Sequence, residues 1–349
     1  MSAFLEGGSI EMMIVMREGA GEADVAHILE RLQEAGATGH VSTGDVVTVI
    51  GVIGDREVIA GLPLEAYPGV DKVLPILKPY KLVSREFRRT DTVIEIRGRK
   101  IGGGHVALIA GPCSVESRAQ LLAAARFVRD SGATMMRGGA FKPRTSPYAF
   151  QGLGEDGLAY LAEAREETGL PIVTELLDPR HLEAVREFAD VIQIGARNMQ
   201  NFQLLSAVGT VDRPILLKRG MASTVDELLM AAEYVAKGGN TEIILCERGI
   251  RTFETATRNT LDIGAVPTLK QRSHLPVIVD PSHATGRTEL IEPLSLAAIA
   301  AGADGLLIEA HPDPETALCD GGQSLNPGEF ARTAEKIKDM IEWMGKELG

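Results

Sequence analysis

Short apolar runs alternate with segments of helical periodicity along most of this chain. Eight of these runs lie between Val106 and Pro312, and each ends in or near a charged, metal-binding or glycine-rich cluster. In order they are VALIAGPCS, TMMRGGAFKPRT, PIVTELLDP, VIQIGARN, PILLKRGM, EIILCERGI, PVIVDPSHATG and GLLIEAHP. Short strands that alternate with amphipathic helices favour a parallel sheet, and eight such repeats predict an α/β fold, the closed (β/α)₈ TIM barrel. Active sites of such barrels lie at the carboxyl ends of the strands, so function is sought there.

The N-terminal part of the chain has a different pattern, typical of a small α+β unit. The predicted elements are, in order, a strand at Met12–Met16, a helix at 23–36, a strand near 38–42, a strand at 46–54, a short helix within 55–63 and a strand at 70–77. This βαββαβ order is the ferredoxin-like arrangement. The unit has no evident catalytic cluster, so we interpret it as a regulatory ligand-binding domain. A folding or dimerisation accessory is the alternative.

These patterns predict three parts. They are a ferredoxin-like regulatory domain over residues 1–77, a linker and hairpin over 78–104, and the catalytic barrel over 105–349. Residues 78–91 are basic and are interpreted as a solvated face, with contact to the acidic N-terminal unit or the barrel rim as the alternative. The hairpin at 92–104 leads into the first barrel strand, and we expect it to close the bottom of the barrel.

Composition narrows the class of protein. The 349 residues are 44% hydrophobic and 24% charged, which is typical of a soluble globular protein. A net charge of -12 argues against a general nucleic-acid surface, which needs clustered cations. Three scattered cysteines are too few for a disulfide framework, which indicates a reducing compartment. No segment has the pattern of a signal peptide or a membrane span, so we expect a cytoplasmic protein without nucleic-acid or membrane partners.

Four potential metal ligands stand at or just after the ends of the first, seventh and eighth predicted barrel strands. They are Cys113, His283, Glu309 and Asp320. These strands are neighbours in a closed barrel, so their ends meet at one mouth. One thiolate, one imidazole and two carboxylates suit Mn, Fe, Co or Zn. Taken singly, each residue reads as a buried cysteine or a solvated polar group, but their joint placement favours a divalent metal site.

A second set of strand-end residues is cationic, against the acidic balance of the chain. Its members are Arg137, Lys142, Arg144, Arg197, Lys218 and Arg248. Glu175 or Glu247 can neutralise one or two of them, which still leaves a surplus. Such a pocket binds phosphate or carboxylate oxygens, and arginine suits two-pronged contacts with them. A Schiff-base lysine at Lys142 or Lys218 is the alternative.

Eight motifs resemble 3-deoxy-D-arabino-heptulosonate 7-phosphate (DAHP) synthase almost continuously over residues 106–330. They are GPCSVES, MRGGAFKPRTSPYAFQGLG, TELLD, IGARNMQN, LLKRG, CERGIRTFE, DPSHATGR and IEAHPDP…LCDGGQSL. The N-terminal unit narrows the resemblance to the type Iβ branch, which carries a ferredoxin-like regulatory domain. The resemblance implies a metal-dependent transferase that condenses phosphoenolpyruvate with erythrose 4-phosphate. This reaction is the first step of the shikimate pathway to chorismate and the aromatic amino acids.

Two alternatives stay open beside this reading. One is 3-deoxy-manno-octulosonate 8-phosphate synthase, which shares the barrel and the phosphoenolpyruvate pocket. That enzyme has a KANRSS-like stretch where this chain has KPRTS from Lys142, and the difference favours erythrose 4-phosphate over arabinose 5-phosphate. The other alternative is a non-catalytic sensor of aromatic amino acids, against which the complete set of strand-end residues argues.

The resemblance also implies roles for the site residues. Cys113, His283, Glu309 and Asp320 become the metal ligands, and phosphoenolpyruvate is surrounded by Arg137, Lys142, Arg197, Lys218 and Arg248. Arg144 and Thr145 hold the phosphate of erythrose 4-phosphate. Lys142 is the expected proton donor to the developing alkoxide, and Glu175 a weaker candidate for the proton of the attacking water. We further expect inhibition by tyrosine or phenylalanine through residues 11–77, and a homodimer or homotetramer.

Cys319 is not placed by the resemblance. It stands next to the expected ligand Asp320, so we expect it to approach Cys113 when the metal leaves. A freed Cys113 thiolate among arginines should have a lowered pKa and react readily with oxidants. A reversible Cys113–Cys319 disulfide is therefore one hypothesis, and a passive small residue at Cys319 is the other.

Overall fold

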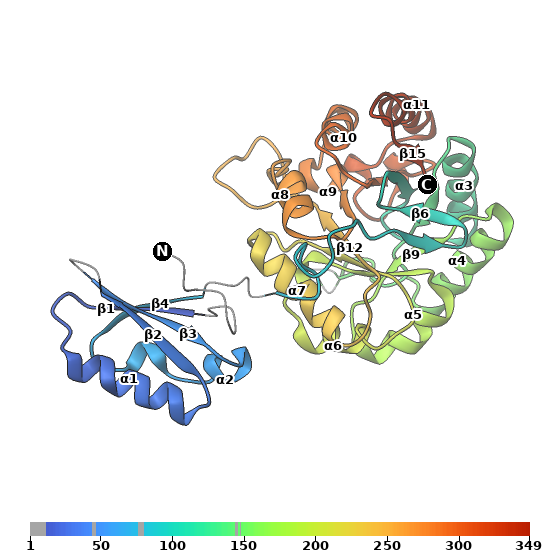
Figure 1. Ribbon diagram of the computed structural model, residues 1–349. Coiled ribbons are helices and arrows are strands. Elements are labelled where there is room, and N and C mark those ends of the chain that lie inside the picture. Colours follow the sequence, from blue (N-terminus) through green and yellow to red (C-terminus); the bar gives the residue numbers. More distant parts are fainter. Residues whose placement is uncertain (1–11, 44–46, 76–79, 144–145, 147) are drawn as a thin grey trace. The chain divides into compact units, whose positions relative to one another are not determined.

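The computed structural model describes the chain except for residues 1–11, 44–46, 76–79, 144–145 and 147. The chain forms two compact units, Met1–Pro79 and Tyr80–Gly349 (Figure 1). The domain boundary predicted at residue 77 falls among residues outside the described ranges. Each unit is considered by itself below.

The smaller unit is a four-stranded antiparallel sheet with helices. Its elements are β1 (Met12–Met16), α1 (Glu22–Glu34), β2 (Thr38–Thr43), β3 (Thr48–Ile53), α2 (Arg56–Ala60), a 3-10 turn (Leu64–Ala66) and β4 (Val70–Pro75). The strand order is β2-β3-β1-β4. Ile28 and Leu32 of α1 are fully buried against a sheet core that includes Ile14 and Ile50. The βαββαβ order expected from the sequence is confirmed.

The larger unit is a closed barrel of eight parallel strands. These are β7 (His105–Gly111), β8 (Met135–Arg137), β9 (Ile172–Glu175), β10 (Val191–Ile194), β11 (Ile215–Lys218), β12 (Ile243–Glu247), β13 (Val277–Val279) and β14 (Gly305–Glu309). Each strand pairs with the next, and β14 pairs in parallel with β7 to close the barrel. Every one of the eight apolar runs supplies one strand, so the predicted barrel is confirmed.

Helices surround the strands on the outside of the barrel (Figure 1). They are α3 (Arg118–Asp130), α4 (Glu155–Thr168), α5 (Leu182–Phe188), α6 (Phe202–Val208), α7 (Val225–Lys237), α8 (Ala265–Arg272), α10 (Ile291–Ala300) and α11 (Pro327–Trp343). The short helix α9 (Pro281–Thr285) instead follows β13 directly at the carboxyl end of the strands. In α7 the Thr224 side chain accepts from Glu227 N–H, and the Glu227 carboxylate accepts from Thr224 N–H, which fixes the start of the helix. Among the described residues, no helix is both long and apolar enough to cross a membrane.

A hairpin fills the amino-terminal end of the barrel. It consists of β5 (Ile94–Ile96) and β6 (Arg99–Ile101), which pair antiparallel. Ile94, Ile96 and Ile101 are buried in one cluster with inward-facing strand residues such as Ala107 and Val191. This arrangement agrees with the expected plug at the bottom of the barrel. The C-terminal strand β15 (Glu347–Leu348) pairs with the first residues of β7.

The connector between the units is fastened to the barrel. The Glu233 carboxylate of α7 accepts the backbone N–H groups of Leu82 and Val83, at 2.8 and 3.1 Å. His274 Nε2 lies 2.8 Å from the Leu82 carbonyl oxygen, and its Nδ1 lies 2.7 Å from Thr92 Oγ1. The interpretation of the connector as a solvated face is therefore wrong for residues 82–84, which are largely covered by the barrel.

Candidate active site

A cavity of about 420 Å³ lies at the carboxyl ends of the barrel strands. The predicted site residues that line it are Arg137, Lys142, Glu175, Arg197, Lys218, Arg248, His283 and Asp320. Cys113 and Glu309 are buried and lie close to members of this lining. The fold thus brings both predicted clusters, the metal ligands and the cations, to one mouth.

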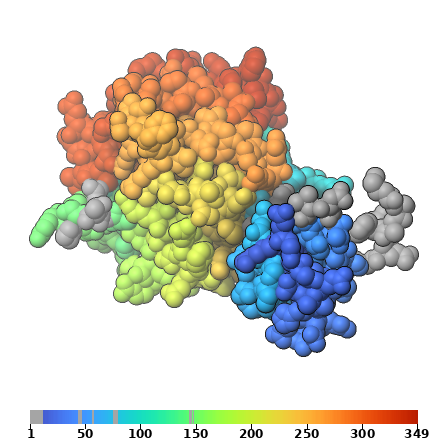
Figure 2. Space-filling view, turned by 90° about the vertical axis from the view of Figure 1, so that its left-hand side faces the viewer, coloured from blue at the N-terminus to red at the C-terminus, as the bar shows by residue number. Residues whose placement is uncertain are grey.

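Arg144 and Thr145 lie outside the described residues, so their predicted contact with a phosphate stays a prediction. The residues on either side of them, Pro143 and Ser146, line the cavity. Tyr148 in the same loop is 97% exposed. Figure 2 shows the segment near residue 150, in green beside grey atoms, standing out from the surface of the barrel unit.

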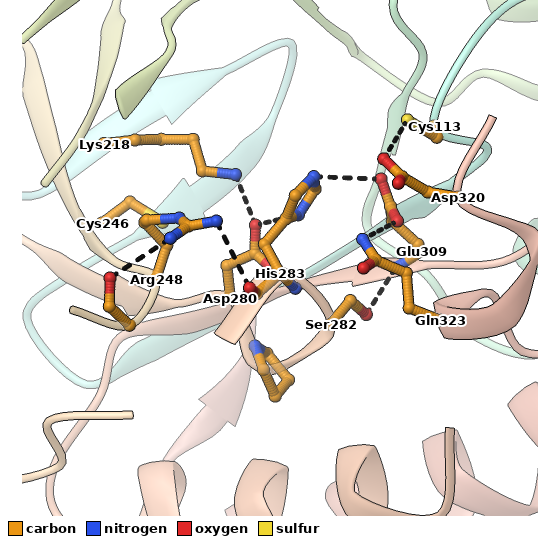
Figure 3. Close-up of polar contacts among 12 residues, drawn as sticks. Cys113, Lys218, Cys246, Arg248, Asp280, Ser282, His283, Glu309, Asp320 and Gln323 are labelled. Atoms are coloured by element: carbon orange, nitrogen blue, oxygen red, sulfur yellow. Dashed lines mark hydrogen bonds and ion pairs between the residues drawn. The ribbon is translucent and has the colours of Figure 1, made fainter. Parts of the chain in front are cut away.

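The potential metal ligands form two groups that share Asp320. In one group the ligand atoms of His283, Glu309 and Asp320 all lie within 4.8 Å of one another, and in the other those of Cys113, Cys319 and Asp320 do. Cys113 Sγ lies 3.2 Å from Asp320 Oδ2, and His283 Nε2 lies 3.3 Å from Glu309 Oε1 (Figure 3). Glu309 Oε1 is buried and has no hydrogen-bond partner among the described residues. An acceptor that faces other ligand atoms in this way fits a bound cation.

Asp280 orients two predicted site residues, and the sequence reasoning missed it. Its buried carboxylate pairs with Lys218 and lies 2.7 Å from His283 Nδ1. Burial acts to raise the pKa of Asp280, but His283 and Lys218 outweigh it and hold this pKa well below its usual range. With Nδ1 facing Asp280, the Nε2 atom of His283 faces Glu309, as in carboxylate–histidine–metal arrangements. The acid three positions before His283 in DPSHATG was the available signal.

His283 itself favours the neutral state that binds a metal. Burial lowers the pKa of its imidazole, although the carboxylates of Asp280 and Glu309 act in the opposite direction. A neutral ring with Nδ1 turned to Asp280 offers Nε2 as a ligand atom. The donor set of one imidazole, two carboxylates and one thiol therefore fits a divalent transition metal.

Arg137 carries unsatisfied donors at the cavity. It is almost fully buried, and its Nη2 lies 3.3 Å from Glu309 Oε1. Within the described part of the chain, its Nε and Nη1 atoms have no hydrogen-bond partner. Because a buried guanidinium with free N–H groups is costly, this arrangement fits a site that receives an anion.

Lys142 is held as a cation beside Cys113. Its Nζ donates to the Cys113 carbonyl oxygen at 2.8 Å and lies 3.1 Å from the Cys113 sulfur. Burial acts to lower the pKa of Lys142, but Cys113 in its thiolate form, together with Glu175, outweighs it and raises this pKa above its usual value. A Schiff-base lysine needs the opposite shift, so the structure argues against that alternative at Lys142.

Glu247 does not neutralise a pocket cation, contrary to one sequence-based option. Its side chain is fully buried and pairs with Arg219 at 2.9 Å, while Arg219 also pairs with Asp262 at 2.8 Å. Strand alternation explains this arrangement, because Lys218 and Arg248 line the cavity while the adjacent Arg219 and Glu247 face away from it. A carboxylate that does neutralise a cavity cation is Asp280, which pairs with Lys218.

Other cavity residues were not singled out from the sequence. Gln193, Met221, Arg251, Arg258 and Asn259 contribute to the lining. Arg258 lies 3.5 Å from Asp320 and 2.8 Å from Gln323. Arginines are common on protein surfaces, so only their place in the folded loop after β12 distinguishes Arg251 and Arg258.

Cys319 does approach Cys113, with the two sulfur atoms 3.2 Å apart and no disulfide bond between them. The expected low pKa of Cys113 is wrong, however. The hydrogen bond with Cys319, together with burial, raises the pKa of Cys113 well above its usual value. The geometry suits a disulfide, but without metal the thiol is not activated by its surroundings.

We expect mild peroxide treatment of the metal-free protein to join Cys113 and Cys319 slowly. One sulfur is oxidised to a sulfenic acid with release of water, and attack by the second thiol releases another water and forms the S–S bond. Peptide mapping should find the cross-linked pair, and a reductant should restore the free thiols. Cys319→Ser, which cannot form the cross-link, is the control. If peroxide lowers the enzymatic activity of this variant as much as that of the unmodified chain, the cross-link is not the cause of the loss of activity.

The sequence of this chain is similar to those of known proteins. Residues 90–345 match the DAHP synthetase I family, and residues 12–78 match the DAHP synthase ferredoxin-like domain. The chain is 52% identical over 337 residues to a phospho-2-dehydro-3-deoxyheptonate aldolase of Thermotoga maritima, which covers 97% of this chain and 100% of the relative. It is 36% identical over 255 residues to a 2-dehydro-3-deoxyphosphooctonate aldolase of Syntrophotalea carbinolica, covering 68% and 91% of the two chains.

Solved structures give the same relationship. The crystal structure of the Thermotoga maritima DAHP synthase matches with a TM-score of 0.94 and 51% identity, over 98% of this chain and 100% of that one. A truncated form of the Thermotoga maritima enzyme matches with a TM-score of 0.73 and 52% identity, over 77% of this chain and 99% of that one.

Proposed function

The chain belongs to the DAHP synthetase I family, and from this premise we propose how its cavity performs the DAHP synthase reaction. The enzyme condenses phosphoenolpyruvate with erythrose 4-phosphate, giving DAHP and phosphate at the start of aromatic biosynthesis. The observation that carries the proposal is one cavity that joins metal-binding groups to a surplus of cations. Turnover with erythrose 4-phosphate but not arabinose 5-phosphate tests it, and turnover of neither would favour a non-catalytic sensor.

The proposed metal ligands are Cys113, His283, Glu309 and Asp320. Their soft and hard donor atoms suit Mn, Fe, Co or Zn, and elemental analysis of the purified protein identifies which ion it holds. When bound, a divalent ion supplies Lewis-acid polarisation of the aldehyde. Asp280 keeps His283 in the tautomer that presents Nε2, and Arg137 balances the negative charge of Glu309.

The cations are proposed to position the two anionic substrates. Phosphoenolpyruvate contacts Arg137, Lys142, Arg197, Lys218 and Arg248, while Arg144 and Thr145 hold the phosphate of erythrose 4-phosphate. Carbon 3 of phosphoenolpyruvate forms a bond to the aldehyde carbon, water adds at carbon 2, and the C–O bond to phosphate then breaks. Holding both reactants in contact supplies a large part of the rate enhancement.

Two residues are proposed to move protons. Lys142 is a buried ammonium, so it can protonate the alkoxide that develops from the aldehyde. Glu175 lines the cavity at the end of β9 and takes the proton of the water that adds at carbon 2. A Cβ at Gly195 would lie 1.9 Å from a Glu175 oxygen, so the absence of a side chain at this position lets the carboxylate occupy its place.

Arg144→Ala is expected to raise the KM for erythrose 4-phosphate by about 10- to 150-fold, since a charge-assisted hydrogen bond contributes about 1.5–3 kcal/mol. The KM for phosphoenolpyruvate should change little, because other cations hold that substrate. Steady-state kinetics with each substrate varied in turn measures both constants. Arg99→Ala, in the hairpin at the opposite end of the barrel, is the matched control, and equal effects on both KM values would mean that Arg144 serves a different subsite.

The N-terminal unit is proposed to mediate feedback inhibition by tyrosine or phenylalanine. Its described residues contribute no ligand to the metal groups. The unit contains a cavity of about 460 Å³ lined mainly by apolar residues, which admits an aromatic side chain. An inhibitor acts only through different affinities for two states, typically worth about 1–3 kcal/mol. A homodimer or homotetramer is the proposed assembly. A reducing cytoplasm is the proposed compartment, because three scattered cysteines that form no disulfide bonds in the described structure are typical of one.

Removal of residues 1–79 is expected to leave turnover intact and abolish inhibition. The cut precedes Tyr80 because Leu82 and Val83 are held by Glu233 of the barrel and should be kept. Rates are compared with and without each aromatic amino acid, using the full chain as reference. Unchanged sensitivity of the shortened enzyme would place the inhibitory site in the barrel unit.

A further inference from the structure

The two oxygens of Glu309 have different surroundings. Oε2 accepts a hydrogen bond of 2.6 Å from Gln323 Nε2, whereas Oε1 lies 3.3 Å from His283 Nε2 (Figure 3). Oε1 also lies 3.3 Å from Arg137 Nη2. Ser282 Oγ accepts the Glu309 backbone N–H at 3.0 Å, which fixes the backbone from which the carboxylate extends. Oε2 is thus hydrogen-bonded to Gln323, and Oε1 faces the potential ligand atom of His283.

Arg258 determines which way the Gln323 amide points. Its Nη1 lies 2.8 Å from Gln323 Oε1. A guanidinium can only donate hydrogen bonds, so the amide oxygen must face Arg258 and the amide nitrogen must face Glu309. Gln323 is 3% exposed, so water does not compete strongly for either end of the amide. The direction of both hydrogen bonds is therefore fixed: Arg258 donates to the amide oxygen of Gln323, and the amide nitrogen of Gln323 donates to Glu309.

The position of Gln323 in the fold supports a role at the same site. Gln323 ends the short 3-10 turn Gly321–Gln323, and Asp320 immediately precedes that turn in a left-handed conformation with φ of 51°. A left-handed backbone is rare for residues other than glycine and is kept where the surroundings over-determine it. One turn thus supplies the side chain of Asp320 and the amide that contacts Glu309.

We propose that Gln323 is a positioning residue for metal binding, because its amide donates to Glu309 Oε2 and leaves Oε1 as the single ligand atom. Without this hydrogen bond the carboxylate is free to rotate about its terminal torsion, and its ordering must come from the metal itself. Contacts of this kind behind a ligand typically change metal affinity by about 10- to 100-fold. This role rests on the proposed metal site.

The test measures the affinity of the full-length, metal-stripped protein for Co²⁺ by competition with a chelator. Gln323→Met keeps the length of the side chain and removes the amide, and Gln323→Asn keeps an amide but shortens it. Both are expected to raise the Kd for Co²⁺ by about 10- to 100-fold. The thiolate-to-cobalt absorption band should persist at saturating Co²⁺, because Cys113 is unchanged.

Gln193→Met is the matched control, since Gln193 is also a buried glutamine at the cavity but is not a partner of Glu309 in the described structure. Its Kd should equal that of the unmodified chain. If Arg258 acts through the amide, adding Arg258→Met to Gln323→Met should raise the Kd less than Arg258→Met does alone.

The outcomes separate the two levels of the proposal. An unmodified chain that fails to bind Co²⁺ contradicts the metal site itself. Binding by the unmodified chain together with an unchanged Kd in the folded Gln323 variants overturns only the positioning role. Thermal unfolding of each metal-free variant identifies a variant that does not fold, in which case the other Gln323 variant decides.

Discussion

Replacement of His283 with alanine is expected to reduce kcat by about a thousandfold or more, because Lewis-acid stabilisation of a transition state is worth several kcal/mol. The imidazole lies between Asp280 and Glu309. Its removal takes one donor atom from the ligand group of His283, Glu309 and Asp320. Metal content per chain, measured together with kcat, should fall in parallel. Treatment of the unmodified enzyme with a chelator should have the same effect, and a divalent transition metal should restore turnover.

His105→Ala is the matched control for this experiment. His105 begins β7, at the end of the barrel away from the cavity, so its loss should leave metal content and kcat unchanged. The thermal unfolding temperature of metal-free His283→Ala should be close to that of the metal-free unmodified chain. The His283 side chain lines the cavity and is not part of the hydrophobic core. Full activity in a protein shown to be free of metal would contradict the proposed chemistry.

Lys142→Met is expected to lower kcat by about 10²- to 10⁴-fold, the range typical for loss of a positioned general acid. The KM for phosphoenolpyruvate should also rise, because the same ammonium lies among the substrate cations. Since the pKa of Lys142 is raised, its acid form is complete throughout the neutral range. Activity of the unmodified enzyme should therefore not decline from deprotonation of Lys142 until the pH exceeds the ordinary lysine range.

Lys338→Met, on the exposed face of α11, serves as the control for loss of one positive charge. Single-turnover kinetics at saturating substrate separates the chemical step from binding. If Lys142→Met retained kcat and changed only KM, Lys142 would be a binding residue and the proton donor would have to be sought elsewhere.

The fold was largely readable from the sequence because its signal is local and repeated. Each barrel strand is a short apolar run, and its last residues meet those of the other strands once the sheet closes. Pairing of the consecutive strands β13 and β14 brings His283 and Glu309 together, and closure through β14 and β7 adds Cys113. The small unit was readable for a similar reason, since helical spacing in α1 and the apolar residues of β1 and β3 are visible without tertiary information.

Partner choice was less predictable, because it depends on which polar atoms meet in space. Asp280 and Gln323 lie inside recognisable motifs, but nothing in the linear order shows that one contacts Lys218 and the other Glu309. The sequence likewise gave no reason to pair Glu247 with Arg219. The pKa of Cys113 was predicted in the wrong direction because burial and Cys319 outweigh the neighbouring lysine.

The isoleucine-rich hairpin at the amino-terminal end of the barrel affects how reactants enter and products leave the cavity. Ile94, Ile96 and Ile101 fill the interior below the strand ends, so in the described structure the cavity is a blind well with its opening at the strand carboxyl ends. Both reactants enter, and both products leave, by that opening. If one reactant binds deeper than the other, the deeper one must enter first. We therefore expect ordered addition of the two reactants and inhibition by phosphate, which initial-rate kinetics would show.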